Sequence, residues 1–339
     1  MSGVFMYAAN AVLPIVLLIL LGYFLRCVGF YDDKFLKTAN KLGFRVALPT
    51  LLFYNVYEIS SLGAIKWSGV IFAVAAILVL FVLGLIVVKI AVRDDRQKGV
   101  VLQSAFRSNF AIIGVPLAEA LGGSETLAVV SVLSAFSIAL FNVLGVVSLS
   151  VFVGEENDKK PGFKSVFVKI IKNPLIIGIV LGLLTVAVRS LEPLGVDSQP
   201  VFTIKNDLPF LYSAISTLAK MASPLMLIVL GGQFSFKADK ELKGQIILGT
   251  AMRILIAPLL GLGAAVLLSG TTSFFSFNAS EYAAFVALFG SPIAVSSAVM
   301  AAEMGNDEQL AGQLVVWTSI GSVFTVFLSA VILKTVGLL

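Results

Sequence analysis

Ten separate stretches of about 20 mostly apolar residues divide the chain, and this pattern restricts its fold more than any other feature. A helix of ~20 residues is ~30 Å long, which matches the hydrocarbon core of a bilayer, and it satisfies its own backbone hydrogen bonds there. The sequence therefore predicts an all-α polytopic membrane protein. The stretches cover residues 4–26, 36–57, 68–92, 100–121, 126–152, 173–190, 208–234, 244–268, 282–303 and 310–335.

The composition agrees with this class and excludes several others. Hydrophobic residues make up 58% of the chain and charged residues 13%, which is too apolar for a soluble domain. The net charge of +5 is therefore not a nucleic-acid signal. The chain has no histidine, so it lacks the commonest metal ligand and proton shuttle, and the single Cys27 forms no intrachain disulfide. We expect no cofactor, no metal and no nucleic-acid partner.

The basic residues fall mainly on one side of the predicted membrane. Loops rich in lysine and arginine stay in the cytoplasm, so both termini are expected outside a plasma (cytoplasmic) membrane. Only Lys66, Arg189, Lys205 and Lys334 lie on the opposite side. The cytoplasmic loops carry Arg26, Lys34, Lys37, Lys89, Arg93, Arg96, Lys98, Lys159, Lys160, Lys164, Lys169, Lys172, Lys237, Lys240 and Lys243.

A polar loop in the middle of the chain, GEENDKKPGFKSV from Gly154, separates two groups of five predicted helices. The predicted units are residues 1–152, the cytoplasmic loop 153–172, and residues 173–339. Because five is odd, the second group must enter the membrane the other way up, as in inverted-repeat transporters. Weak internal echoes support this interpretation, such as GGSETLA from Gly122 and GNDEQLA from Gly305.

The fourth and ninth predicted helices contain residues that interrupt a membrane helix. The fourth includes RSNFAIIGVPL at 107–117, and the ninth includes FGSPIAVSSAVMAAEMG at 289–305. Glycine and proline weaken or break helices, and interrupted helices at matching positions of two repeats indicate a transporter's binding site. Freed amides at half-helix starts suit a carboxylate. An offset of 183 residues aligns Asn109 with Pro292, so Pro116 and Pro292 are not equivalent.

Several segments resemble the auxin efflux carrier family, which includes plant PIN-type carriers and bacterial permeases for malate and similar acids. They are PTLLFYNV from Pro49, RSNFAIIGVPLAEALGG from Arg107, NPLIIGIVLGLL from Asn173, MASPLMLIVLGGQFSF from Met221 and SPIAVSSAVMAAEMG from Ser291. The resemblance runs nearly end to end. Its most specific part is SPLMLIVLGGQ together with the two broken helices.

This resemblance implies ten helices in two inverted repeats, with crossing unwound segments in helices four and nine. It implies a scaffold of helices one, two, six and seven, usually dimeric, and a moving transport domain of helices three to five and eight to ten. Asn109 corresponds to the family's asparagine that contacts the substrate carboxylate, and Pro116 and Pro292 lie in the crossover segments. Plant carriers place an acid–lysine pair on helix three, where residues 68–88 carry no charge.

Three basic residues within predicted helices leave alternatives open. Arg107 either neutralises the substrate, closes an inner gate, or extends its side chain to the cytoplasmic headgroups. Arg253 in the eighth helix has the same ambiguity. Lys220 in the seventh helix is either a counter-charge for an anion or a structural contact near Pro224, and we favour the structural contact.

The polar uncharged residues also allow two interpretations. Ser131, Ser134 and Ser137 repeat every three residues in the fifth helix, with Asn142 beyond, and they either line a cavity or permit close helix packing. The resemblance places this helix beside the crossover. Two further serines, Ser296 and Ser297, are candidates for a sodium site. No acid falls at the centre of a predicted helix, which favours an anionic substrate over a dedicated cation antiporter.

The predicted function is a secondary transporter of small organic anions, meaning carboxylates such as malate or auxin-like acids. It would work by elevator-type alternating access, with the substrate bound at the crossover. The expected partners are the acid, H⁺ or Na⁺ as alternative coupling ions, the lipid bilayer and a second copy of the chain. The residues predicted to bind substrate are Asn109, Gly114, Val115, Pro116, Ser291, Pro292 and Ser134, with Arg107 and Lys220 as charge partners.

Three alternative functions differ from this one in the class of protein or in the coupling ion. A sodium-coupled organic-anion symporter of the bile-acid type shares a similar architecture. An intramembrane enzyme would need a metal or a catalytic constellation, and the chain offers neither histidine nor clustered acids at mid-depth. A receptor would need a soluble output domain, which the sequence does not contain.

Overall fold

The computed structural model describes residues 17–58, 67–153, 171–191, 202–233 and 240–339, together with residues 14 and 168. Within these residues the regular structure is helical, apart from one isolated bridge between Ser269 and Thr272. The predicted all-α class is confirmed. The first predicted helix is described only over Leu17–Cys27, and the middle loop lies almost entirely outside the described residues.

The elements follow the predicted apolar stretches closely. In chain order after Leu17–Cys27 they are α2 (Asp33–Leu42), η1 (Gly43–Ala47), α3 (Leu48–Tyr57), α4 (Trp67–Ala91), α5 (Asp95–Phe106), η2 (Phe110–Gly114), α6 (Val115–Val151), α8 (Pro174–Leu191), α9 (Ile204–Asp207), α10 (Pro209–Gln233), η4 (Lys240–Leu242), α11 (Lys243–Ala251), η5 (Met252–Ile256), α12 (Ala257–Leu268), η6 (Ser273–Phe275), α13 (Ala279–Gly290), α14 (Ser296–Glu303) and α15 (Glu308–Thr335).

Five described helical stretches are long and apolar enough to cross a bilayer, so the chain is a multi-pass membrane protein by length and composition. Shorter apolar helices accompany them, and the arrangement of ten spans as two inverted repeats stays a prediction. The five stretches are Trp67–Ala91, Val132–Val151, Pro209–Gln233, Lys243–Leu268 and Glu308–Thr335.

Three helices widen into a π-helical segment immediately before a proline. The segments η1, η2 and η5 precede Pro49, Pro116 and Pro258, which lie in the first turns of α3, α6 and α12. Proline has no amide hydrogen, and its ring collides with the carbonyl four residues earlier. The wider turn gives room for the ring at Pro49 and Pro258, and the backbone continues through all three prolines without a break.

α6 contains the predicted boundary between the fourth and fifth helices. Gly123 has φ 71° and ψ −162° inside α6, a backbone conformation that glycine alone adopts easily. The chain therefore bends sharply there, within the predicted gap at residues 122–125.

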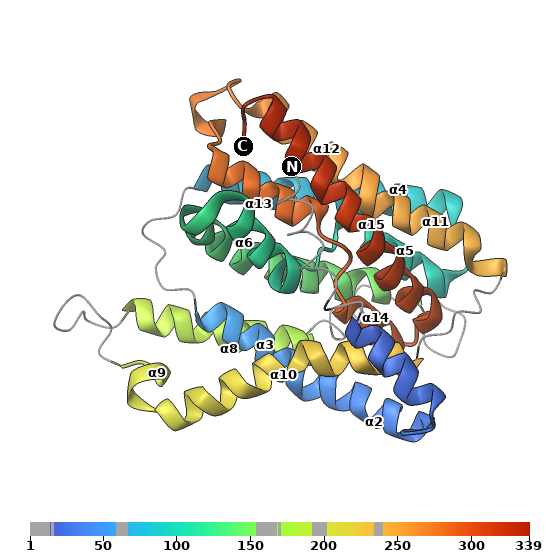
Figure 1. Cartoon of the computed structure of the whole chain (residues 1–339). Helices are drawn as coiled ribbons and strands as arrows, with labels where there is room; N and C mark the ends of the chain where they lie inside the picture. The colour runs from blue at the N-terminus through green and yellow to red at the C-terminus, as the bar shows by residue number, and fades with distance from the viewer. Residues whose placement is uncertain are drawn as a thin grey trace.

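Figure 1 shows two groups of helices. α2, α3, α8, α9 and α10 occupy the lower part of the view, while α4, α11, α12, α13 and α15 occupy the upper part. α14 lies where the groups meet and contacts both α10 and η1. Segments from the two halves of the sequence are therefore mixed within each group.

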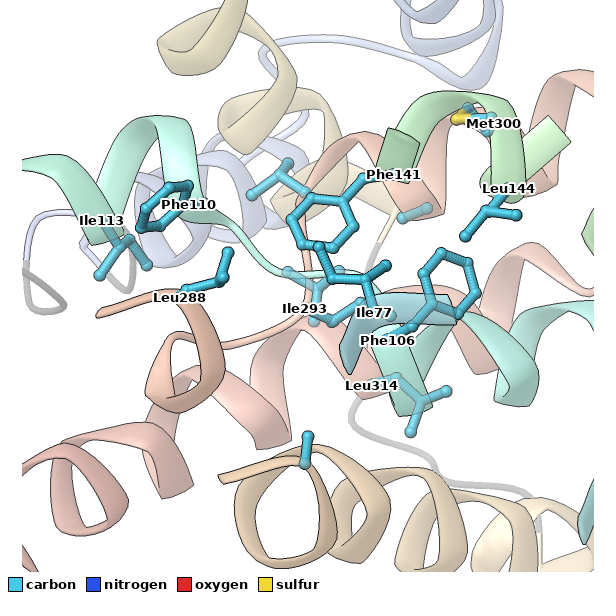
Figure 2. Close-up of a cluster of buried hydrophobic side chains, with 14 of the residues drawn as sticks. Ile77, Phe106, Phe110, Ile113, Phe141, Leu144, Leu288, Ile293, Met300 and Leu314 are labelled. Atoms are coloured by element: carbon cyan, nitrogen blue, oxygen red, sulfur yellow. The ribbon is translucent and has the colours of Figure 1, made fainter. Parts of the chain in front are cut away.

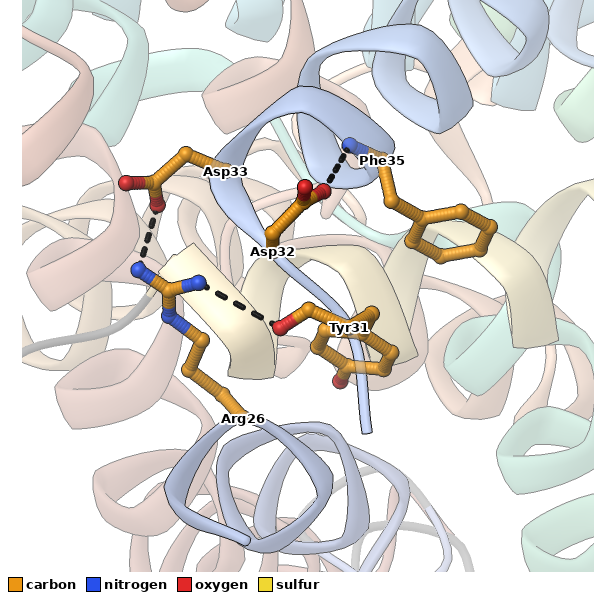
Figure 3. A network of polar contacts seen from close by, with 5 residues as sticks. All are labelled: Arg26, Tyr31, Asp32, Asp33 and Phe35. Atoms are coloured by element: carbon orange, nitrogen blue, oxygen red, sulfur yellow. Dashed lines mark hydrogen bonds and ion pairs between the residues drawn. The ribbon is translucent and has the colours of Figure 1, made fainter. Parts of the chain in front are cut away.

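The turn between the first helix and α2 is fixed by polar contacts (Figure 3). Asp32 caps α2 by accepting a hydrogen bond from the Phe35 amide at 2.8 Å. Arg26 pairs with Asp33 at 2.6 Å and donates to the Tyr31 carbonyl at 3.3 Å. The Tyr31 hydroxyl in turn donates to a carbonyl of the first helix. This network holds α2 against the preceding helix at the predicted cytoplasmic surface.

Glycines allow α8 and α3 to pack with their backbones in contact. A Cβ atom on Gly178 would collide with the carbonyl oxygen of Pro49, and one on Gly182 would lie 2.7 Å from Cβ of Val56. The spacing Gly-x-x-x-Gly places both glycines on one helix face, which is the usual device for close packing of membrane helices.

Gly178→Leu should lower the thermal unfolding temperature of the purified protein in detergent by several degrees. The added side chain overpacks the α3–α8 contact, a change that costs about 1–3 kcal/mol. Gly263→Leu is the matched control, because a Cβ on Gly263 would meet no atom within 4 Å. Equal shifts of the two variants would contradict this account of the α3–α8 contact.

Candidate substrate-binding site

The chain leaves the helical conformation at two buried places, residues 107–109 between α5 and η2 and residues 291–295 between α13 and α14. Arg107 is extended, with φ −82° and ψ 119°, and Ser291 is extended at the end of α13. The Asn109 amide donates a hydrogen bond of 2.8 Å to the carbonyl oxygen of Pro292. A backbone hydrogen bond therefore joins the two interruptions, which are far apart in sequence.

The first interruption does not lie at the Gly114-Val115-Pro116 step, where the sequence favoured it. Gly114 is helical within η2, and a Cβ there would collide with the ring of Phe110. The helix continues through η2 into α6, and the chain instead leaves the helical conformation at residues 107–109. There the Asn109 amide donates to the Pro292 carbonyl and not to a carbonyl of its own helix. The side chains of Val115 and Pro116 lie outside the described part.

The interruptions are embedded in tightly packed apolar side chains (Figure 2). Eight of the ten labelled residues are no more than 1% exposed, so the backbone around each break is fixed by packing. They are Ile77, Phe106, Phe110, Ile113, Leu288, Ile293, Met300 and Leu314.

A cavity of about 60 Å³ lies between the two interruptions and the helices α3, α6, α8 and α10. At ~10–15 Å³ for each water-sized sphere, it has room for a few waters or part of a small solute. Its lining combines a cluster of polar groups with a mostly apolar wall. The lining residues are Leu48, Leu51, Leu52, Asn55, Arg107, Ser108, Asn109, Ile138, Phe141, Asn142, Leu175, Met226, Ala294, Val295 and Ser296.

Arg107 is the charged residue of this lining, and it is 1% exposed. Its Nη1 donates to Gln103 Oε1 and Met300 Sδ, both at 2.8 Å. Its Nη2 donates to Asn142 Oδ1 at 2.9 Å and Ser296 Oγ at 2.8 Å. All four acceptors are neutral, and Nε has no hydrogen-bond partner.

No aspartate or glutamate in the described part of the chain forms an ion pair with Arg107. An unpaired charge in a low-dielectric interior costs several kcal/mol, about the range that membrane insertion and protein burial both indicate. Within the described residues, the positive charge that Arg107 presents to the cavity is therefore uncompensated.

Arg253 is also 1% exposed, yet it has a different partner. Its Nη2 donates to the carbonyl oxygens of Leu288 and Phe289 at the end of α13, while its Nε and Nη1 have no hydrogen-bond partner. The C-terminal carbonyls of a helix carry partial negative charge, so the guanidinium stabilises this helix end. The sequence left the same alternatives for both arginines, and the structure separates them.

The other predicted residues are only partly brought together. Asn109 lines the cavity, and its buried Nδ2 has no hydrogen-bond partner. Ser291 donates back to the Ala287 carbonyl at 2.6 Å, and Pro292 contributes its carbonyl to Asn109. Ser134 is half-buried and is not part of the lining. The side chain of Ser131 is outside the described part.

Lys220 lies on an exposed face of α10 and does not reach the cavity. Ser296 lines the cavity but accepts its hydrogen bond from Arg107, and Ser297 is buried behind it. A sodium ion at Ser296 would face the positive guanidinium, which disfavours it there. Among the described residues no group of three or more acids and cysteines is placed to hold a metal.

Sequence reasoning gave no role to Asn55, which faces the cavity from α3. It proposed Asn142 only as the end of a serine stripe, whereas this side chain holds Arg107. Each is an asparagine in a predicted membrane-spanning helix, and a buried amide in such a helix needs a polar partner. That is the signal that marks both positions.

Comparison with known proteins places this geometry in a family. The profile of the family described as membrane transport protein matches residues 7–329. The chain belongs to this family of membrane transport proteins. The match confirms the resemblance to auxin efflux carriers that the broken helices and SPLMLIVLGGQ suggested.

Two archaeal relatives have the same general description. One is an uncharacterized transporter of Methanothermobacter thermautotrophicus, 23% identical over 97% of this chain and 100% of the relative. The other is the uncharacterized transporter MJ1031 of Methanocaldococcus jannaschii, 26% identical over 75% of this chain and 77% of the relative. A membrane transporter family is consistent with a protein that moves a solute without transforming it.

Replacing each buried arginine should separate the two roles. Arg107→Gln should lower uptake of a transported acid at least about tenfold, because it removes the positive charge that lines the cavity. Arg253→Gln should lower the unfolding temperature by several degrees, because hydrogen bonds from a charged group contribute about 1.5–3 kcal/mol, and it should leave uptake per folded protein within about twofold, because Arg253 does not line the cavity. Equal losses of uptake in the two variants would contradict this assignment.

Proposed function

We propose that this chain is a secondary transporter of small organic anions, with the carboxylate bound in the cavity between the two interruptions. The observation that carries the proposal is the buried Arg107, which contacts only neutral acceptors and lines a cavity. A carboxylate would supply the negative charge that no acid in the described part of the chain supplies.

Three kinds of group would hold the carboxylate. The Arg107 guanidinium provides the charge, and its unpartnered Nε is a free donor. The Asn109 side-chain amide provides a neutral donor. The backbone at the starts of η2 and α14 carries partial positive charge, although the amides of Ser297 and Ala298 already donate to the carbonyls of Ala294 and Val295. The hydrogen bond between the Asn109 amide and the Pro292 carbonyl holds the starts of η2 and α14 close to each other.

The lining favours one carboxylate attached to an apolar body. Nine of the fifteen lining residues are apolar, including Leu51, Phe141 and Met226, and Arg107 is the single charge among them. A dicarboxylate such as malate would leave its second charge against this apolar wall, where desolvation is costly. An aromatic or aliphatic monocarboxylate matches both parts of the cavity.

The proposed mechanism is elevator-type alternating access on ten helices in two inverted repeats. Helices one, two, six and seven (represented by Leu17–Cys27, α2–α3, α8 and α10) would form the scaffold, and the rest would form the transport domain with crossing helices four and nine. The cavity is lined from both sets. A hydrogen bond of 3.1 Å between Asn40 of α2 and Glu303 of α14 crosses the boundary between these sets, and it would break as the domain moves.

The surroundings of Lys220 support a homodimer in a bilayer. This exposed lysine is near the middle of α10, which is long enough to span the membrane. A lysine facing lipid at that depth costs about 2.5–3.5 kcal/mol, so a second copy covering this face would stabilise it. We propose both termini outside the plasma membrane, from the distribution of basic loops.

The first test is charge movement in proteoliposomes on adding indole-3-acetate, malate or other dicarboxylates, with and without sodium and proton gradients. We expect indole-3-acetate to move negative charge without an ion gradient, and we expect a smaller response to malate. A response that requires sodium would instead support the bile-acid-type symporter. Silence to every acid would contradict the substrate class.

Asn109→Ala should reduce transport of the responding acid by about tenfold, the effect of losing one hydrogen bond of ~1.4 kcal/mol. Its protein yield and unfolding temperature should stay unchanged, because the Nδ2 has no partner within the protein. Asn206→Ala on the exposed face of α9 is the matched control. Normal flux in Asn109→Ala would show that this side chain does not bind the substrate.

A further inference from the structure

We propose that the protein works mainly as an anion exchanger, in which uptake of one organic anion is fast when another leaves on the same site and slow when the site returns empty. This inference rests on the proposed function and concerns how the site moves back across the membrane after it releases its substrate. The observation behind it is that the empty site holds an unpaired buried cation, Arg107.

The hydrogen-bond partners of Arg107 all lie on one side of the proposed moving boundary. Gln103 is in α5, Asn142 in α6, and Ser296 and Met300 in α14. All three elements belong to the proposed transport domain. When the transport domain moves, Arg107 and its hydrogen-bond partners therefore move together, and the positive charge moves with them.

The scaffold side of the cavity offers no compensating charge. Its lining consists of leucines and one methionine from α3, α8 and α10, with Asn55 as the polar exception. During reorientation of the empty protein, the guanidinium would have to pass this apolar wall unpaired. Such a step is slow, because an uncompensated charge is strongly disfavoured in a low-dielectric environment.

A bound monocarboxylate changes the balance of charge. Carboxylic acids are ionised at neutral pH, so the loaded site carries +1 from Arg107 and −1 from the substrate. The pair passes the apolar wall as a neutral unit. Loaded reorientation is therefore faster than empty reorientation, and the protein turns over rapidly only when an anion is available on both sides of the membrane.

The two modes also differ in electrical behaviour. Exchange of one monocarboxylate for another moves no net charge, so a membrane potential should not alter its rate. Net uptake includes the return of the empty site with its positive charge, so its rate should depend on the potential. Net uptake transfers one negative charge for each cycle, and this agrees with the charge movement expected in the first test.

The test compares uptake of labelled indole-3-acetate, or labelled malate if that acid gives the larger current, into proteoliposomes with and without the same unlabelled acid inside. We expect internal acid to accelerate uptake at least about tenfold. A potassium diffusion potential set with valinomycin should alter net uptake and leave exchange unchanged. Equal rates with and without internal acid would overturn exchange and leave the proposed function standing.

Two variants separate the charge of Arg107 from its packing. Arg107→Lys retains the cation, so the acceleration by internal acid should persist even if uptake is weaker. Arg107→Gln removes the cation, so at saturating substrate the ratio of exchange to net uptake should fall toward one. An unchanged ratio in Arg107→Gln would overturn the inference. If the wild-type protein shows neither net uptake nor exchange of any acid, both the inference and the proposed function fail.

Discussion

The guanidinium of Arg107 is the group on which the rest of the site depends. Its four hydrogen bonds join α5, α6 and α14, so one side chain ties together helices from both halves of the sequence. These bonds satisfy the donors on Nη1 and Nη2 but not Nε, and they leave the charge uncompensated because every acceptor is neutral. The local structure therefore stabilises the position of a cation while leaving its charge available to an anion.

The backbone around Arg107 follows from the same requirement. A continuous helix through residues 107–109 would bond every amide within the helix, whereas here the Arg107 amide donates to the Gln103 carbonyl and the Asn109 amide donates outside its own helix. The hydrogen bond from Asn109 to the Pro292 carbonyl compensates for part of the break and fixes the two interruptions relative to each other. Close apolar packing around Phe110 and Ile293 then keeps water away, which strengthens each remaining electrostatic interaction.

The sequence predicted the helices well, because apolar length is a local property that the bilayer requires of every span. It placed the second interruption at Pro292, where α13 ends and the chain resumes at Ser296. It misplaced the first interruption. The helix continues through η2 and Pro116, and the observed break depends on a hydrogen bond to the Pro292 carbonyl, almost 200 residues away in the sequence. The roles of Arg107 and Arg253 could not be separated for a similar reason, since both are arginines in apolar helices and only their tertiary partners differ.

Among the described residues, neither Arg107 nor Arg253 forms an ion pair, but only Arg107 lines the cavity. Arg253 donates to carbonyls at the end of α13, whose partial negative charge favours a cation there. An aspartate beside Arg107 would stabilise the empty site, but it would also compete with a carboxylate for the charge. Under the proposed function, the free energy that an unpaired Arg107 costs the empty site is recovered when the anion binds.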